Sequence, residues 1–274
     1  MHKNKEAQLS EIKSLGLPDI QGKNDSRNIQ IDRVGVKSVK MPIKLLTSAG
    51  TSQSMSEKVD MYVALEPECK GTHMSRFLEV FSSYSEKISS TNMCSLASKI
   101  KEKLNAPSAE VIVSFTYFQR KLAPVTGSEG FIDYEITLAA KTSPEPTCFI
   151  EVSAPATSLC PCSKEISKYG AHNQRCRINA NVRGSENIEI DDLIRHIEQA
   201  SSCEVYSTLK RPDEKYVTEK AYENPKFVED IVRDLAILLN NDARIHWYKI
   251  SSENEESIHS HNAYAEIEHT KSNV

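Results

Sequence analysis

The sequence predicts an α+β fold, in which antiparallel strands form sheets and helices pack on one face of them. Three observations lead to this prediction: segments in which apolar and polar residues alternate, amphipathic segments with a helical period, and the order in which the two kinds occur. That order is strands, two helices and strands, and it occurs twice along the 274 residues. We therefore expect two units, residues 31–150 and 151–274, after a mobile leader at residues 1–30.

Strands are expected where the side chains alternate with a period of two. Residues 109–118 (AEVIVSFTYF) are the strongest example. The other expected strands cover residues 31–43, 58–65, 131–140, 148–154, 175–182, 245–251 and 263–269.

Helices are expected where apolar residues recur every three or four positions. In residues 75–87 this spacing places Phe77, Val80, Phe81 and Tyr84 on one face. The other expected helices cover residues 92–104, 190–200 and 225–239. The polar segment 210–218 (KRPDEKYVT) is interpreted instead as a solvated, turn-prone loop.

The composition is that of an ordinary globular protein, with 39% hydrophobic and 26% charged residues. The net charge of -4 gives no general attraction to nucleic acid or membranes, so we expect neither as a partner. No apolar run approaches the roughly 18 residues of a membrane span, and the N-terminal residues lead into no apolar segment typical of a secretory signal. The cytoplasm is the expected compartment.

The chain has seven cysteines, an odd number scattered along the sequence. This pattern argues against a disulfide framework. Most of the seven are expected to be small apolar core residues. Cys160 and Cys162 differ, because they flank a single proline in a segment dense with polar residues.

The same segment continues to His172, twelve positions after Cys160. A thiolate and an imidazole can together bind a borderline-soft cation such as Zn²⁺ or Fe²⁺. A third ligand from elsewhere would leave one position open for water, which is the pattern of a catalytic metal site. By spacing alone, however, a Cys-X-Cys pair is more often incidental or part of the packing.

Candidates for further site residues lie downstream, and each also has a plainer explanation. The segment 210–218 can be a solvated loop, and Glu229 can be a charge on the solvent side of a helix. His259 and His261 flank Ser260, so on a strand both would face the same side. They can equally belong to a polar tail.

Two long motifs give a specific resemblance. Residues 160–164 (CPCSK) with 170–175 (GAHNQR) resemble the active-site segment of the type IB GTP cyclohydrolases. Residues 71–77 (GTHMSRF) resemble that family's first-half motif, and 32–36 (DRVGV) resemble its opening strand. The resemblance extends from Ile31 over most of the chain. It implies a tunnelling fold, in which antiparallel sheets with paired helices assemble into barrels.

The resemblance also implies a metal site. Cys160 and His172 match metal ligands at the catalytic centre, and Glu214 falls where a further metal-site residue is implied. One divalent ion per active site is expected, either Zn²⁺, Mn²⁺ or Fe²⁺. Cys162 remains an alternative direct ligand or an acid/base neighbour.

The substrate implied is GTP, whose guanine ring is opened on the way to folate. Glu229 matches the carboxylate that holds the purine, which it can do by accepting hydrogen bonds from N1–H and the exocyclic amine. His259, and with it His261, matches the family's catalytic histidine region. An imidazole suits the required proton transfers because its usual pKa is about 6.5.

The triphosphate requires cations, and the net negative charge favours a local basic pocket over a basic surface. The candidates lie in or beside the matched motifs: Arg76, Lys164, Arg175, Lys210 and Arg211. The resemblance further implies a homotetramer with active sites between subunits. One position departs from the family pattern, since Cys176 stands where a small residue, commonly serine, follows Asn-Gln-Arg.

Three other functions remain open at this stage. An archaeal-type relative would form a cyclic-phosphate pterin from GTP. A tunnelling-fold nitrile reductase would use a cysteine nucleophile and NADPH, without a metal. A non-catalytic module would bind a purine or zinc without turnover.

Overall fold

The structure, a computed structural model, describes residues 18–46, 52–184 and 188–271. These residues form a nine-stranded sheet, whose strands follow the order β1-β2-β3-β4-β5-β6-β8-β9 with a short β7 beside β5. Every neighbouring pair of strands in this order is antiparallel. The α+β class is therefore confirmed.

The strands are β1 (Ile31–Leu46), β2 (Ser52–Leu65), β3 (Ala109–Leu122), β4 (Glu129–Lys141), β5 (Thr147–Leu159), β6 (Asn173–Gly184), β7 (Cys203–Glu204), β8 (Ile245–Asn254) and β9 (Ala263–Thr270). The helices are α2 (Met74–Ser82), α3 (Met93–Leu104), α4 (Pro161–Ile166), α5 (Ile190–Ala200), α6 (Arg211–Glu223) and α7 (Val228–Asn241). A single 3₁₀ turn (Ser85–Lys87) follows α2.

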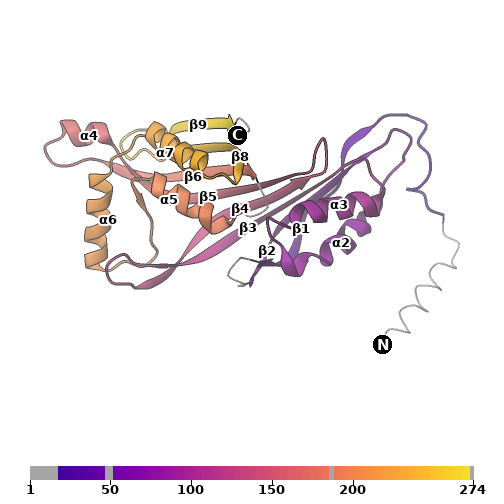
Figure 1. The fold of residues 1–274 in the computed structure, drawn as a ribbon, viewed down its shortest axis with the longest axis horizontal. Helices are drawn as coiled ribbons and strands as arrows, with labels where there is room; N and C mark the ends of the chain where they lie inside the picture. Colours follow the sequence, from indigo (N-terminus) through magenta and orange to yellow (C-terminus); the bar gives the residue numbers. More distant parts are fainter. Residues whose placement is uncertain (1–17, 47–51, 185–187, 272–274) are drawn as a thin grey trace.

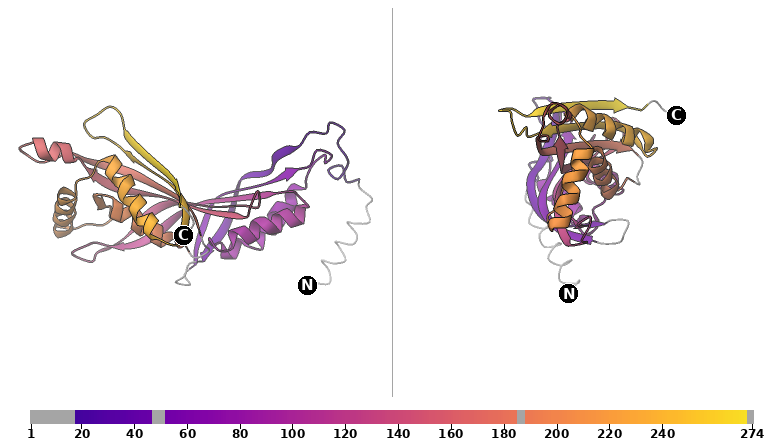
Figure 2. Two further views of the ribbon diagram at one scale, coloured as in Figure 1. Left: turned by 45° about the horizontal axis from the view of Figure 1, so that its top comes forward. Right: turned by 90° about the vertical axis from the view of Figure 1, so that its left-hand side faces the viewer.

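Two pairs of helices pack on the sheet at opposite ends of the elongated molecule. Helices α2 and α3 contact the half formed by β1 to β4, and α5 and α7 contact the half that ends with β8 and β9 (Figures 1 and 2). Strand β3 shows how the sheet offers the helices an apolar face. Its residues Val111, Val113 and Phe115 occupy alternate positions, point towards the helices and are buried. Apolar burial of this kind contributes about 25 cal/mol per Å².

Gly35 in the opening motif is required by the pairing of β1 with β2. A β-carbon at this position would lie 2.0 Å from the carbonyl oxygen of Met61, in the facing strand. Only glycine permits such a close approach of two backbones.

All eight strands and four helices expected from the sequence are present, with small differences at their ends. The interpretation of residues 210–218 as a loop is wrong, because they lie in α6. This helix buries only Asp213 and Ala221, so its sequence carries no apolar period. Pro212 in its first turn suits a helix start, since the missing N–H would have no partner there.

The described part of the expected leader lies against the segment that follows β2. Asp25 N–H donates to the Glu68 carbonyl at 2.8 Å, and the Gln21 side chain donates to the Thr72 carbonyl at 3.0 Å. Residues 1–17 lie outside the described residues. The expected boundary at residue 150 falls inside β5, which pairs with β4 and β6, so the division into two units stays a prediction.

All seven cysteines are described. Cys94 and Cys148, which are 54 positions apart, form a disulfide between α3 and β5, and the other five are free. There is no disulfide framework, as expected, but this one bridge was not foreseen. It arises because packing of α3 on the sheet brings the two α-carbons to 6.0 Å.

The start of α6 is held by Asp213, whose side chain is completely buried. Its carboxylate accepts hydrogen bonds from the backbone N–H groups of Val125, Thr126 and Lys210, each at 2.9 Å, and from the Thr126 hydroxyl at 2.7 Å. Loss of hydration acts to raise the pKa of Asp213, but these hydrogen bonds outweigh it and hold the pKa below its usual range. One carboxylate thus joins α6 to the β3–β4 turn.

We expect Asp213→Asn to lower Tm by a few degrees at pH 7, because the amide can accept fewer of these hydrogen bonds. A carboxyl group with a lowered pKa stabilises the fold above the unfolded value, about 3.9, and this contribution is lost as the pH falls. The difference in Tm should therefore shrink below about pH 4. Thermal unfolding followed by circular dichroism across pH 3 to 8 measures it.

Asp230→Asn is the matched control, since Asp230 caps α7 through one exposed hydrogen bond from Phe227 N–H at 3.0 Å. It should change Tm less. Equal losses of Tm for the two variants would contradict the role given to Asp213.

Candidate functional site

A cavity of about 440 Å³ opens where β5 and β8 end and β6 begins, beside α4 and the start of α7. Figure 1 shows these elements gathered at one end of the molecule. The cavity is lined by six residues that the sequence analysis selected: Cys160, Cys162, His172, Glu229, His259 and His261. It is also lined by polar residues to which the sequence analysis gave no individual role: Ser158, Ser163, Gln174, Lys226, Asn254 and Glu256.

Cys160 and His172 face each other just beyond the last pair of β5 and β6. The Cys160 N–H donates to the His172 carbonyl at 3.1 Å, which extends the ladder by one step. Cys160 is also the N-cap of α4, and its Sγ accepts from the Ser163 N–H at 3.4 Å. The Ser163 hydroxyl joins the two segments, since it donates to the Cys160 carbonyl and accepts from the His172 N–H, both at 3.2 Å.

Behind these two residues lies a buried chain of hydrogen bonds. His172 Nδ1 lies 2.9 Å from Gln174 Oε1, and Gln174 Nε2 donates to Ser158 Oγ at 3.4 Å. Ser158 also accepts from Asn254 Nδ2 and donates to the Lys226 carbonyl, both at 3.0 Å. Gln174 lies in the matched motif 170–175, but no apolar period or motif marks Ser158, Asn254 or Lys226, which only the strand register and the packing reveal.

His259 and His261 lie in the β8–β9 loop, so their placement on a strand is wrong. The loop still brings them together, and their rings stack with centroids 5.2 Å apart and an interplanar angle of 20°. Both are exposed at the edge of the cavity.

Glu229 lies in the first turn of α7 and is exposed at the cavity. Its neighbour Asp230 caps the helix by accepting from Phe227 N–H. Among the described residues, no hydrogen bond or ion pair occupies the Glu229 carboxylate. Both of its oxygens are therefore available to a ligand.

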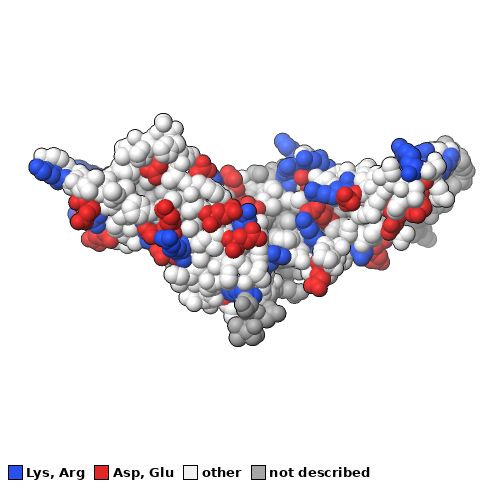
Figure 3. All heavy atoms as spheres, turned by 90° about the horizontal axis from the view of Figure 1, so that it is seen from above, with Lys and Arg blue, Asp and Glu red and all other residues white. Residues whose placement is uncertain are grey.

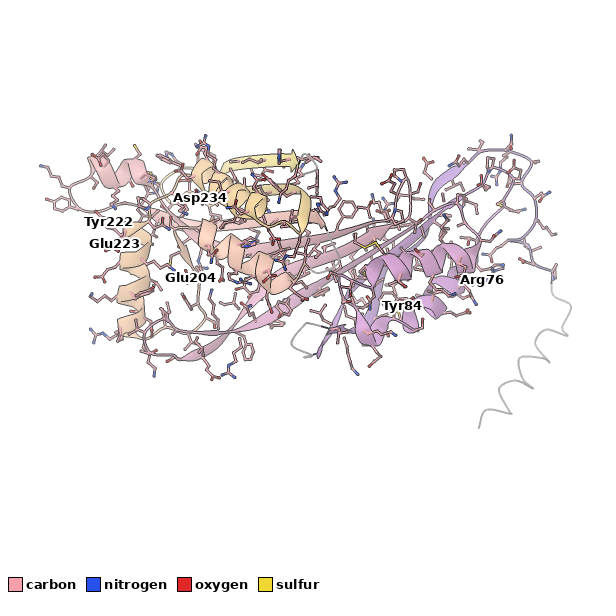
Figure 4. The ribbon with its side chains drawn as sticks, in the orientation of Figure 1. Arg76, Tyr84, Glu204, Tyr222, Glu223 and Asp234 are labelled. Carbon is pink, nitrogen blue, oxygen red and sulfur yellow. A yellow bond between two sulfur atoms is a disulfide. The ribbon has the colours of Figure 1, made fainter. Side chains whose placement is uncertain are left out.

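The other predicted residues do not line this cavity. Glu214, Lys210 and Arg211 lie at the start of α6, next to the β3–β4 turn. Tyr222 and Glu223 mark the opposite end of that helix, beside α4 (Figure 4). At 1.5 Å per residue, about 12 Å of helix separate Glu214 from Tyr222.

The remaining predicted cations are also elsewhere. Arg76 lies on α2 at the far end of the molecule (Figure 4). Lys164 donates to the Tyr222 carbonyl at 2.5 Å, with its ammonium 4.4 Å from the centre of that ring. Arg175 faces a second cavity, of about 190 Å³, on the other side of the same strands.

Glu204 and Cys203 line this second cavity. Loss of hydration acts to raise the pKa of Glu204, but hydrogen bonds from Lys220 at 2.6 Å and Tyr206 at 2.7 Å outweigh it and lower the pKa to about 2. Glu204 is thus a structural anion that holds β7 to α6. Burial raises the pKa of the neighbouring Cys203 to about 12, which makes its thiol unreactive.

Two of the three predicted metal ligands thus share one cavity. A thiol sulfur and an imidazole nitrogen are a donor set that suits a borderline-soft divalent cation. Within the described residues of one chain, no group of three or more His, Cys, Asp or Glu side chains is close enough to hold a metal. The donor pair of Cys160 and His172 fits a metal, and among the described residues no third side chain is close enough to complete it.

Residues 17–265 match the model of a family described as type I GTP cyclohydrolase folE2. The chain belongs to that family. Among its FolE2 relatives, the GTP cyclohydrolase FolE2 of Magnetococcus marinus is 48% identical over 257 residues, which cover 93% of this chain and 96% of the relative. The GTP cyclohydrolase FolE2 of Paraburkholderia phymatum is 48% identical over 256 residues, with 93% and 96% coverage.

Among solved structures, uricase from Arthrobacter globiformis is similar with a TM-score of 0.55. The likeness covers 88% of this chain and 93% of the uricase chain, at 7% sequence identity. At this identity it shows the fold alone. In the described part of the FolE2-family chain, no helix is long and apolar enough to cross a bilayer.

The departure from the family pattern at Cys176 concerns packing and not the site. Cys176 is buried in the core on β6, where burial raises the pKa of its thiol to about 12. Its side chain does not line the cavity. A cysteine in place of serine therefore leaves the site unchanged.

We expect the five free cysteines of this FolE2-family chain to react with iodoacetamide in two groups. Cys69 and Cys162 are exposed and Cys160 is partly exposed, whereas Cys176 and Cys203 are buried with raised pKa values. Peptide mass spectrometry should find the first group modified at least tenfold faster in the folded protein. Added Cd²⁺ should slow modification of Cys160 but not of Cys69, which serves as the control. Labelling of Cys203 as fast as Cys69 would contradict the packing of α6 on β7.

Proposed function

We propose that this protein is a GTP cyclohydrolase I, which converts GTP and water to 7,8-dihydroneopterin triphosphate and formate at the start of folate synthesis. The observation that supports it best is the convergence of Cys160, His172, Glu229 and His259 in one cavity, although they are spread over about a hundred residues. Family membership supports the same activity. The cavity volume of about 440 Å³ lies within the usual range for ligand sites, roughly 300–1,000 Å³.

Cys160 and His172 are proposed to hold one divalent ion, either Zn²⁺, Mn²⁺ or Fe²⁺. Such an ion lowers the pKa of water from 15.7 towards about 7 and so supplies a nucleophile near neutral pH. Glu214 is proposed as a further metal-site residue. Since it lies at the far end of α6, we propose that it comes from another copy of the chain.

Glu229 is proposed to bind the guanine ring. Its free carboxylate can accept two parallel hydrogen bonds, from N1–H and from the exocyclic amine. The neighbouring Phe227 and Val228, and Ile258 across the cavity, supply apolar surface for the ring. This arrangement would exclude adenine, which presents a different pattern of donors at the same edge.

His259 is proposed as the group that moves protons during ring opening and hydrolysis, with His261 beside it. Protons must reach the ring nitrogens released from C8 and the ribose oxygen. An imidazole can both give and accept protons near neutral pH. The exposed loop allows these rings to approach a bound nucleotide.

The triphosphate is proposed to bind cations contributed by more than one chain. Lys226 is the one Lys or Arg that lines the cavity among the described residues, and its Nζ pairs with Asp234 at 2.7 Å. Figure 3 shows acidic and basic residues interspersed over the face seen from above, without a continuous basic area. The proposed phosphate-binding residues therefore serve the site in an assembly: Arg76, Lys164, Arg175, Lys210 and Arg211.

We propose a homotetramer with barrels of sheets and active sites between subunits, located in the cytoplasm. Neither nucleic acid nor a membrane is proposed as a partner. Such an assembly would explain why only two of the three proposed metal ligands, Cys160 and His172, line the cavity. It would also explain why the proposed phosphate-binding residues lie outside this cavity. In a closed symmetric assembly, residues at the end of one subunit that is far from its own cavity can lie at the cavity of a neighbouring subunit.

The activity is tested with chelator-stripped protein, GTP and Mn²⁺, Zn²⁺ or Fe²⁺ added separately. We expect metal-dependent release of formate and a pterin that fluoresces after oxidation. Cys160→Ala and His172→Ala should each lower kcat at least a hundredfold, since each removes one donor of the cation. Cys69→Ala is the matched control, because Cys69 is an exposed cysteine outside the cavity.

Folded protein that binds GTP but releases no formate with any metal would overturn the enzyme and favour a binding module. Chromatography of the product separates the linear triphosphate from a cyclic phosphate. A cyclic product would favour the archaeal-type reaction at the same site.

The shared site is tested by mixing Glu214→Ala and Cys160→Ala, refolded together in equal amounts, because each variant removes one proposed residue of the metal site and should be inactive. If each site takes one residue from each of two chains, roughly one quarter of the sites then hold both wild-type residues. Activity should therefore reappear in the mixture. A mixture of Cys160→Ala with His172→Ala is the control, since these residues lie in the same cavity, and it should stay inactive. No recovery in the first mixture, with subunit exchange shown by mass spectrometry, would contradict a shared site.

A further inference from the structure

We propose that Gln174 is a positioning residue that keeps the hydrogen of His172 on Nδ1 and leaves Nε2 bare for the metal. This inference rests on the proposed function, because it concerns the metal role of His172. It goes further by assigning a task to a buried residue that binds neither metal nor substrate. The His172–Gln174 contact is 2.9 Å, the shortest side-chain hydrogen bond in the buried chain behind the cavity.

The orientation of the Gln174 amide follows from its neighbours. The Ser158 hydroxyl gives its one hydrogen to the Lys226 carbonyl at 3.0 Å, so towards Gln174 it can only accept. Glu256 Oε1, 3.4 Å from Gln174 Nε2, belongs to a carboxylate and also accepts. Both neighbours therefore require the NH₂ group, and the amide oxygen must face His172.

The amide oxygen in turn selects the tautomer of the imidazole. An amide oxygen accepts and never donates, so the nitrogen at 2.9 Å must carry a hydrogen. In a neutral imidazole the other nitrogen, Nε2, then carries the lone pair. Among the described residues, Nε2 has no hydrogen-bond partner, while the ring lines the cavity.

Ser257 is the other group near this nitrogen, with its Oγ 3.4 Å from His172 Nδ1. A hydroxyl can donate as well as accept, so it does not distinguish the two tautomers. It is also exposed and can bind water instead. The selection therefore depends on Gln174.

The sheet holds this arrangement in place. Ser158 and Gln174 are direct partners in the register of β5 and β6, and Asn254 on β8 donates to Ser158 from the next strand. Residues on three strands thus fix the orientation of the Gln174 amide, and this amide in turn fixes the tautomer of the His172 ring. When a metal-ligating histidine loses the group that hydrogen-bonds its second nitrogen, the affinity for the metal typically falls by about 10- to 100-fold.

The test is a Co²⁺ titration of chelator-stripped protein, which requires no turnover. The absorption bands of Co²⁺ report its ligands, and the titration gives Kd. Gln174→Met keeps the shape of the side chain and removes the acceptor, so Kd should rise by about 10- to 100-fold. Gln119→Met is the matched control, because it removes an exposed amide hydrogen bond to Asp191, and it should leave Kd unchanged.

A second variant separates the acceptor from simple packing. Gln174→Glu combined with Glu256→Gln exchanges the carboxylate and the amide, so an oxygen again faces Nδ1–H and an amide faces residue 174. The Ser158 hydroxyl can turn from the Lys226 carbonyl and donate to the new carboxylate. We expect Kd to return to within about threefold of the wild type, well inside the 10- to 100-fold loss. If the exchange variant binds Co²⁺ as weakly as Gln174→Met while folded, the role is structural and the proposal is overturned.

The remaining outcomes are also decisive. An unchanged Kd in folded Gln174→Met overturns the positioning role alone, and the cyclohydrolase proposal stands if the wild type turns over GTP. A wild-type protein that binds no Co²⁺ overturns the metal site and this inference with it. Should Gln174→Met fail to fold, Gln174→Ala replaces it, because the smaller side chain also removes the acceptor without adding bulk behind the cavity. An unchanged Kd for folded Gln174→Ala would equally overturn the proposal.

Discussion

The antiparallel pairing of β5 with β6 runs without a shift in register until Leu159 lies opposite Asn173. The next residues are Cys160 and His172, which the last ladder hydrogen bond holds together. A slip of one residue would turn every side chain of β6 to the opposite face. Gln174 would then leave the buried chain behind the cavity, and Cys176 would leave the core. The site thus depends on a register that the buried alternation of both strands enforces.

The strands and long helices could be predicted because burial imposes a period on their sequences. Strand β3 alternates between buried and partly exposed side chains, and α5 buries Leu193, Ile194 and Ile197 on one face. The sites of Cys160, His172, Glu229 and His259 could be predicted from motif resemblance, and the cavity holds all four. The spacing of His259 and His261 favoured two neighbouring positions on one face of a strand. In the structure both residues lie in a loop, where their rings stack.

Helix α6 could not be predicted because polar contacts hold it in place. Its start depends on a buried carboxylate that binds a turn about 87 residues earlier in the chain, and no local pattern records such a contact. The hydrogen-bonded chain behind His172 is equally invisible, since Ser158 and Asn254 are 96 positions apart. Leaving one of these buried groups without its partner would cost about 1–3 kcal/mol. These residues are therefore constrained as strongly as apolar core residues, although the sequence gives no sign of it.

The charges and donors that line the cavity of one described chain do not by themselves complete the proposed site. The cavity contains two soft donors and a free carboxylate at Glu229, while its one lysine is already paired with Asp234. A triphosphate would meet no free cation there, and a metal would find no third side chain within the described residues. Glu214 at the far end of α6 and Arg76 at the far end of the sheet are proposed members of the site, and neither can reach the cavity by rearranging side chains. Because both lie at the extremities of an elongated chain, association of several copies can complete the site without any change in the fold.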